Sequence, residues 1–135
     1  MQNTDASGFF TVAVGTLANG TYSWRVKGPS AATPYTDTNA TTGSLANTGT
    51  VTLSGASITQ QEMALMRTAD CNNNNAVNAQ DFNILKPAFG KSSGRPGYDN
   101  RAEFTGHSQV NVSDFNLLKL NFGSGGAPPI GPCTS

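Results

Sequence analysis

The sequence predicts an α+β protein with a small antiparallel, β-sandwich-like unit over residues 1–66 and a pair of loop–helix repeats over residues 67–124. Two observations predict this division. Segments of the first part alternate apolar and polar residues with a period of two, which is typical of strands. The second part repeats itself after 33 residues, and each copy joins an oxygen-rich loop to an apolar helical pattern. Residues 125–135 are rich in Gly and Pro and are expected to be an extended tail.

Four strands are expected in the first part, over residues 8–14, 21–27, 50–53 and 58–66. The first of them is apolar on both faces. The turn signal Asn19-Gly20 joins it to the second, so the two are expected to form a hairpin. The fourth also suits a short helix. A unit of this size buries little core of its own and is expected to lean on the rest of the chain or on a neighbour.

The helix of each repeat is predicted by a cap and an apolar face. Asn78 can cap the first helix with Asp81 in its first turn, and Phe82, Leu85 and Phe89 fall on one face. Between residues 77–90 and 110–123, nine of fourteen positions are identical. A duplicated loop–helix unit allows two apolar helix faces to bury each other.

The first loop has oxygen-bearing side chains at positions 1, 3, 5, 9 and 12 of residues 70–81, and position 7 offers a backbone carbonyl. This is the ligand order of an EF-hand calcium loop, because calcium prefers six to eight oxygen ligands on a flexible frame. The expected ligands of this first site are Asp70, Asn72, Asn74, Ala76, Asn78 and Asp81. The alternative is an Asn-rich turn that caps a helix without an ion.

The second loop fits calcium less well. Glu103 is longer than the usual Asp, His107 offers nitrogen, and Ser108 stands where the sharp turn favours Gly. The expected ligands of this second site are Glu103, Thr105, His107, Gln109, Asn111 and Asp114. The alternative is a loop that kept its shape without an ion, held by Val77 against Val110.

Two such loops, each followed by one helix and joined by a short linker, resemble a type I dockerin domain. The resemblance covers residues 67–124 and departs from the family pattern in the second loop. It implies a cohesin-like partner, with contacts at the start of each helix and one or two turns further, at Ala79, Gln80, Lys86, Val112, Ser113 and Lys119. The first unit resembles the small Ig-like or carboxypeptidase-regulatory-like sandwiches found beside dockerins.

The composition argues against several partners. Eight acidic and eight basic residues balance, so nothing points to nucleic acid or an anionic membrane. No run of apolar residues is long enough for a transmembrane helix. The first residues lack the pattern of a signal peptide, so a mature form or a fragment is expected.

The expected calcium affinity predicts a location outside the cell. A loop with so few charges is expected to bind calcium at about 10⁻⁴ to 10⁻³ M, a range that cytosolic calcium would not fill. In that compartment Cys71 and Cys133 are expected to form a disulfide, with two free thiols as the alternative. His107 is the only histidine, and the sequence shows no enzyme signature.

We therefore expect a non-enzymatic, extracellular, calcium-binding structural protein that assembles with other copies of itself. The N-terminal strand could add to an exposed sheet edge of a neighbouring copy and so build a filament. The residues expected to make this contact are Phe9, Phe10, Val12 and Val14. One alternative is a dockerin that docks on a cohesin scaffold through Lys86 and Lys119. Another is a carbohydrate-binding module that uses Tyr22, Trp24 and Tyr35.

Overall fold

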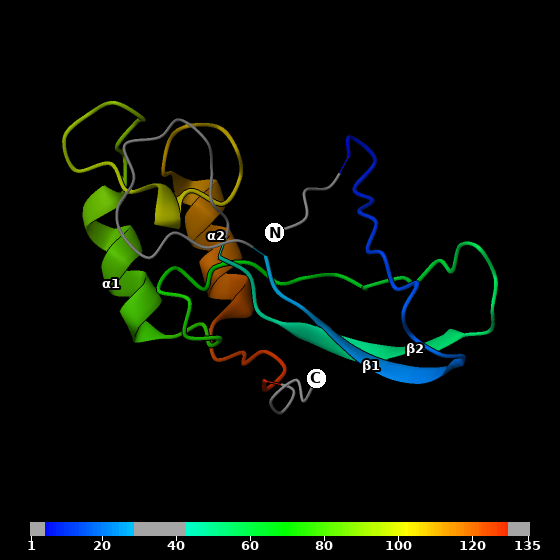
Figure 1. Cartoon of the computed structure of the whole chain (residues 1–135). Helices are drawn as coiled ribbons and strands as arrows, with labels where there is room; N and C mark the ends of the chain where they lie inside the picture. Colours follow the sequence, from blue (N-terminus) through cyan, green and yellow to red (C-terminus); the bar gives the residue numbers. More distant parts are fainter. Residues whose placement is uncertain (1–4, 29–42, 130–135) are drawn as a thin grey trace.

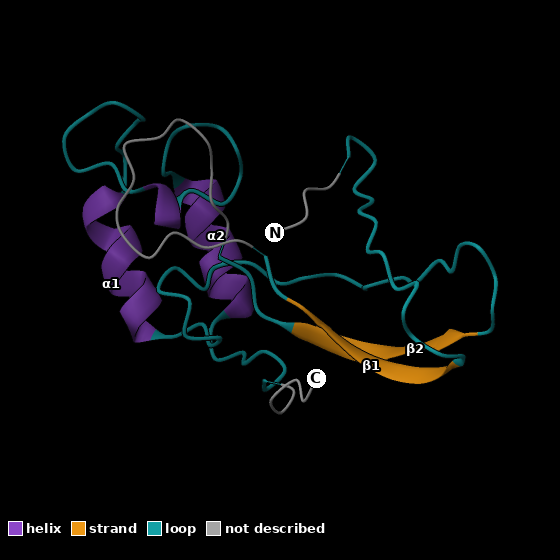
Figure 2. Cartoon of the chain, viewed as in Figure 1, coloured by secondary structure: helices purple, strands orange, loops and turns teal. Residues whose placement is uncertain are grey.

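The computed structural model describes residues 5–28 and 43–129. These residues form a two-stranded antiparallel sheet and two α-helices, so the α+β prediction is confirmed at that level (Figures 1 and 2). The elements in chain order are β1 (Gly20–Val26), β2 (Asn47–Leu53), α1 (Ala79–Ala88), the 3₁₀ turn η1 (Asn100–Ala102) and α2 (Val112–Asn121). We call residues 67–127, which contain both α-helices, the helical module. Figure 1 shows the hairpin of β1 and β2 extending away from this module.

The hairpin has one apolar and one polar face. Its register pairs Tyr22 with Val51 and Trp24 with Gly49, and these residues are half-buried. The indole of Trp24 lies over Gly49, where a Cβ would stand 2.5 Å from a ring carbon. This is the packing by which an aromatic ring covers a strand glycine. The opposite face carries Thr and Ser side chains that are exposed to solvent.

The strands expected at residues 8–14 and 58–66 are wrong for the single chain, and within the described residues no β-sandwich forms. Neither segment finds a strand with which to form a ladder. The chain instead turns back over residues 5–9, because Asp5 accepts hydrogen bonds from the backbone of Ser7 and Phe9 at 2.8 and 3.0 Å. Residues 58–66 are tied to β2 only through the Asn47 side chain, which donates to the carbonyls of Met63 and Leu65.

Both helices begin with the same local device. Asn78 and Asn111 are N-caps, and each forms a capping box with the aspartate three residues later, Asp81 or Asp114. The expected apolar face of α1 is partly wrong. Leu85 and Ala88 are buried, but Phe89 is 49% exposed, because the helix ends at Ala88 and the chain turns outward there.

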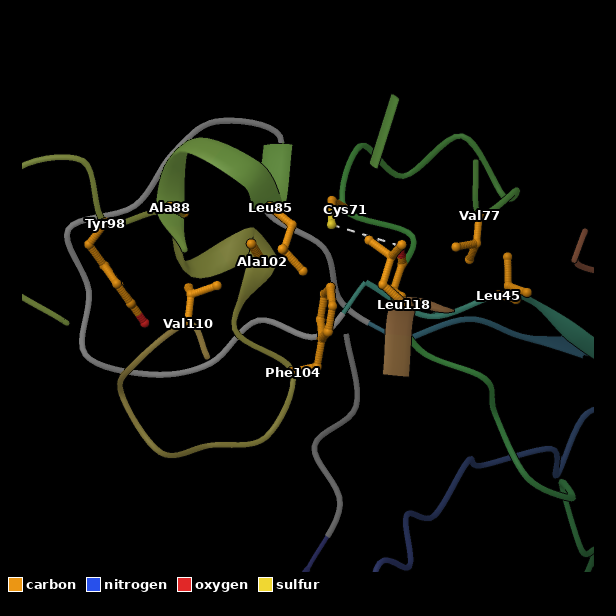
Figure 3. Close-up of a cluster of buried hydrophobic side chains, with 11 residues drawn as sticks. Leu45, Cys71, Val77, Leu85, Ala88, Tyr98, Ala102, Phe104, Val110 and Leu118 are labelled. Carbon is orange, nitrogen blue, oxygen red and sulfur yellow. Dashed lines mark hydrogen bonds between the residues drawn. The ribbon is translucent and has the colours of Figure 1, made fainter. Parts of the chain in front are cut away.

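The hydrophobic core lies in the helical module (Figure 3). Leu85 of α1 and Leu118 of α2 sit at its centre, and the rings of Phe82 and Phe115 approach to 6.3 Å between centroids. The buried members of the cluster are Leu45, Ala69, Cys71, Val77, Leu85, Ala88, Tyr98, Ala102, Phe104, Val110 and Leu118. Of these, only Leu45 comes from the first sixty-six residues, so the hairpin joins this core only at its root.

Each loop is hydrogen-bonded to the chain that follows the helix of the other repeat. Val77 of the first loop exchanges backbone bonds with Gly123 and Ser124, at 2.8 and 2.9 Å. Val110 of the second loop exchanges the equivalent bonds with Gly90 and Lys91. The two buried valines are thus held by the opposite helix ends, and the repeats are locked together reciprocally.

No helix among the described residues combines the length and the apolar character that crossing a bilayer requires.

The boundary between the loop–helix repeats and the tail, expected at residue 124, stays a prediction. The chain just beyond that residue is nevertheless bonded to the first loop, since Gly126 N donates to Asn75 O at 2.8 Å.

Candidate metal centre

The first loop, residues 70–81, gathers two fully buried carboxylates (loop 1). Asp70 accepts hydrogen bonds from the backbone of Asn74 and Asn75 at 3.0 and 2.8 Å. Asp81 accepts from the backbone of Asn72 and Asn78 at 3.2 and 2.8 Å. The two aspartates therefore fold the loop around themselves from its first and last positions.

The intervening asparagines bond to the backbone of the same loop. The side-chain oxygens of Asn72 and Asn74 accept from the backbone two residues on, at 3.0 Å each. Ala76 lies opposite Gly125 in an antiparallel bridge. The two hydrogen bonds of this bridge are made by the neighbours of Ala76, namely Asn75 O with Gly126 N and Val77 N with Ser124 O. In an antiparallel pair the carbonyl of such a residue points away from the partner strand, so the Ala76 carbonyl is left as a ligand.

The backbone has the same unusual conformation at two equivalent positions of both loops. Positive φ occurs at the fourth and sixth positions, at Asn73 (64°) and Asn75 (67°) of loop 1. The equivalent residues 33 positions on, Gly106 (77°) and Ser108 (59°), share it. Positive φ is unfavourable for non-glycine residues and persists where the surroundings require it. Two loops of different sequence therefore keep one ligand-gathering conformation.

The second loop, residues 103–114 (loop 2), holds an unsatisfied carboxylate. Glu103 is fully buried, and its Oε1 accepts from the backbone of Thr105, Gly106 and His107 at 2.9, 2.7 and 3.2 Å. Within the described part of the chain, Oε2 of Glu103 is buried without a hydrogen-bond partner. Because an unpaired buried charge is costly, this oxygen fits a cation ligand.

The other five predicted ligand residues of loop 2 differ in burial and in their hydrogen bonds. Asp114 is buried and accepts from the backbone of Phe104 and Asn111 at 2.7 and 2.8 Å, and the Gln109 carbonyl is oriented like that of Ala76. Asn111 caps α2, and the Thr105 hydroxyl lies 2.9 Å from Glu103. The His107 side chain is exposed, as is that of Asn74 at the equivalent position of loop 1, and its role as a ligand stays a prediction.

Of the two buried aspartates of loop 1, Asp70 pairs with the Lys27 ammonium at 2.7 Å, whereas among the described residues Asp81 has no ion pair. Burial raises the pKa of Asp81 above its ordinary value, and the nearby charge of Asp70 adds to this rise, against the hydrogen bonds from Asn78 and Asn72. Because the pKa of Asp81 is raised in the folded state, stability falls as the pH rises from the ordinary carboxyl pKa to the raised one, and the full cost of ionisation is present above it. A cation between the two aspartates would remove this cost. The donor set, carboxylates with amide and backbone oxygens, is the one that calcium prefers.

Histidine and cysteine do not add to this ligand set. Among residues 5–28 and 43–129, no group of three or more His, Cys, Asp or Glu side chains gathers as a metal cluster. Burial raises the pKa of the Cys71 thiol far above its ordinary value. Cys133 lies outside the described residues, so the disulfide stays a prediction.

The residues predicted to bind partners lie on the surface. Phe9, Val12 and Val14 are 65, 54 and 39% exposed, and Phe10 is half-buried. Lys86 and Lys119 are exposed in the last turns of α1 and α2. A groove of about 310 Å³ runs beside Lys86, and its lining residues are Phe82, Leu85, Lys86, Phe89 and Phe115.

Sequence reasoning missed the contacts that tie loop 1 to the hairpin. Lys27 Nζ donates to Asp70 Oδ2 at 2.7 Å, and the Asn75 side chain bonds to Ala46 N and Ala127 O. The aligned repeats gave no signal for Asn75, because every residue of positions 70–76 differs from its equivalent in positions 103–109. Nothing in the sequence marks Lys27 as a partner of Asp70.

The described residues form two loop–helix repeats beside a β-hairpin. Crystal structures of two interface mutants of a type II cohesin–X–dockerin complex from Acetivibrio cellulolyticus contain a chain of similar fold, with TM-scores of 0.62 and 0.60. Each match covers 90% of this chain and 73% of the other, at 19% identity. The fold is therefore related to that of proteins in cohesin–dockerin complexes. No family model matches the sequence, and no curated protein matches it.

Proposed function

We propose that this chain is a non-enzymatic, extracellular assembly subunit that binds calcium in loop 1 and joins neighbouring copies through its N-terminal segment. The observation that carries the proposal is the exposure of the N-terminal part. None of residues 5–28 is buried. An isolated two-stranded hairpin is marginal in water and needs a further strand or a packed face to be stable.

The missing strand has a source in the same chain. Phe9, Val12, Val14 and Leu17 are all exposed, and they lie in residues 5–19, which form no ladder within the described part of the chain. The hairpin offers two open edges and a half-covered apolar face that includes Tyr22. If one copy donates its N-terminal segment to the sheet edge of the next, the segment and the open edge each gain a hydrogen-bonding partner. Because the donor and acceptor surfaces differ, repetition of the contact builds an open filament.

Removing residues 1–14 tests this proposal. The truncated chain is expected to remain a folded monomer and to form no filaments under electron microscopy, whereas the full chain forms them. A synthetic peptide of residues 1–14 should bind the truncated chain and raise its thermal midpoint, and a scrambled peptide of the same composition should not. Filaments from the truncated chain, or equal effects of the two peptides, would reject strand addition.

A second candidate function is docking on a cohesin-like partner, which the similarity in fold favours. The groove beside Lys86 supports it, because exposed Phe89 and half-buried Phe115 present apolar surface next to a cation. Exchanging Lys86 and Lys119 for Glu is expected to abolish binding to an immobilised cohesin panel if this function holds. The carbohydrate-binding alternative gains nothing from the structure, since the Trp24 ring is committed to Gly49 and Tyr35 lies outside the described residues.

A further inference from the structure

The root of the hairpin is built onto loop 1 through Asn75, the sixth loop position. The Oδ1 atom of Asn75 accepts from Ala46 N at 2.9 Å, directly before β2 begins. Its Nδ2 donates to Ala127 O at 2.8 Å, and its backbone oxygen accepts from Gly126 N at 2.8 Å. One asparagine thus clamps the start of β2 and the chain after α2 to the same turn of the loop.

Lys27 fixes the other strand to the first loop position. This residue directly follows β1, and its ammonium donates to Asp70 Oδ2 at 2.7 Å and to the Ser44 carbonyl. The Lys27 side chain is 17% exposed and that of Asp70 is fully buried, so solvent screens this ion pair only in part. Arg25 Nε also donates to Ala127 O, at 3.2 Å. Hydrogen bonds therefore tie the end of β1 and the start of β2 to loop 1.

The root of the hairpin and loop 1 are closely packed. A Cβ on Gly43 would stand 1.8 Å from the carbonyl oxygen of Asp70, and one on Gly126 would stand 2.1 Å from Oδ1 of Asn75. The backbone of residues 43–45 also pairs with that of residues 67–70, through Leu45 N to Arg67 O at 2.7 Å. Loop 1 and the root of the hairpin are therefore in direct backbone contact.

Loop 2 provides an internal comparison. Ser108 has the same backbone conformation as Asn75, with φ of 59° against 67°. Its carbonyl accepts from Ser93 N at 2.8 Å, within the helical module. The two loops share their fold, but the asparagine clamp on the hairpin belongs to loop 1.

We propose that loop 1 is a cation-dependent latch: Asn75 and Lys27 fix the hairpin to the helical module when the loop is ordered, and release it when the loop opens. The proposal rests on the calcium binding proposed above and adds regulation of assembly to it. The side-chain direction of Asn75 depends on its positive φ, which is unfavourable for a non-glycine residue, so an ion that orders the loop would help to hold the clamp in place. The orientation of the acceptor sheet is thereby tied to calcium.

Hydrogen exchange on the full chain tests the latch, with calcium chloride or with chelator. In the wild type, calcium is expected to slow exchange at Ala46 N–H and in β1 and β2 by at least about tenfold. Asn75→Gly retains calcium binding, because Gly adopts positive φ readily, but loses the slowing in the hairpin. Ser108→Gly, the matched control, keeps it. Lys27→Met is a second variant that is expected to lose it through the other strand.

The outcomes separate this inference from the proposed function. Equal calcium-dependent slowing in the wild type and in Asn75→Gly would overturn the latch, even if filaments form. No calcium-dependent slowing in the wild-type hairpin would overturn it as well. A chain that never forms filaments but shows the slowing, lost only in Asn75→Gly and Lys27→Met, would uphold the latch and reject the assembly role.

Discussion

Replacing Asp81 by alanine is expected to cost more stability in calcium than in chelator. Without calcium, the variant loses the carboxylate that accepts from Asn72 N and Asn78 N, at a cost of about 1–3 kcal/mol. With about 10 mM calcium it also loses the binding free energy of loop 1. For dissociation constants of about 10⁻⁴ to 10⁻³ M, that loss adds about 1.4–2.7 kcal/mol.

Urea unfolding of the wild type and of the variant, each with calcium and with chelator, measures both contributions. Asp81→Asn is the control, since its amide oxygen still accepts a backbone hydrogen bond at the cap while the charge is gone. It should lose most of the calcium-dependent part and less of the other. An equal loss of stability for Asp81→Ala in the two conditions would mean that loop 1 draws no stability from calcium.

Replacing Leu118 by alanine is expected to destabilise the helical module by about 2–5 kcal/mol, because its side chain is 2% exposed and sits among the residues of both repeats. A loss of this size is a large fraction of the stability of an ordinary domain. Leu120→Ala is the matched control on the same helix. Leu120 is 77% exposed, so its replacement should change the free energy of unfolding by less than about 0.5 kcal/mol.

Chemical denaturation that is followed by far-UV circular dichroism compares the two leucine variants. Similar midpoints for Leu118→Ala and Leu120→Ala would contradict a core centred between the two helices. The comparison is independent of calcium if both variants are measured in chelator as well.

The sequence predicted those parts of the structure that short-range signals determine. The Asn78–Asp81 and Asn111–Asp114 spacings placed both helix starts, because a capping box acts within four residues. The 33-residue repeat revealed that the two loops are equivalent, and the structure gives them one backbone conformation. The alternation in residues 21–27 correctly predicted β1 to within one residue.

What the sequence did not reveal depends on long-range partners. Residues 8–14 have the pattern of a strand, but such a pattern cannot say whether a neighbouring strand is present, and residues 5–28 and 43–129 supply none. The contact of Lys27 with Asp70 spans 43 residues, and no local signal encodes it. The pairing of Val77 with Gly123 and Ser124 follows from the way the repeats pack, which their sequences leave open.

Calorimetric titration of the chelator-treated chain with calcium chloride tests the central claim most directly. The wild type is expected to show saturable binding with a dissociation constant near 10⁻⁴ to 10⁻³ M, and Asp81→Ala should lose the binding at loop 1. A wild type that takes up no calcium at millimolar concentrations, while remaining folded, would contradict the claim that Asp70 and Asp81 form a cation site.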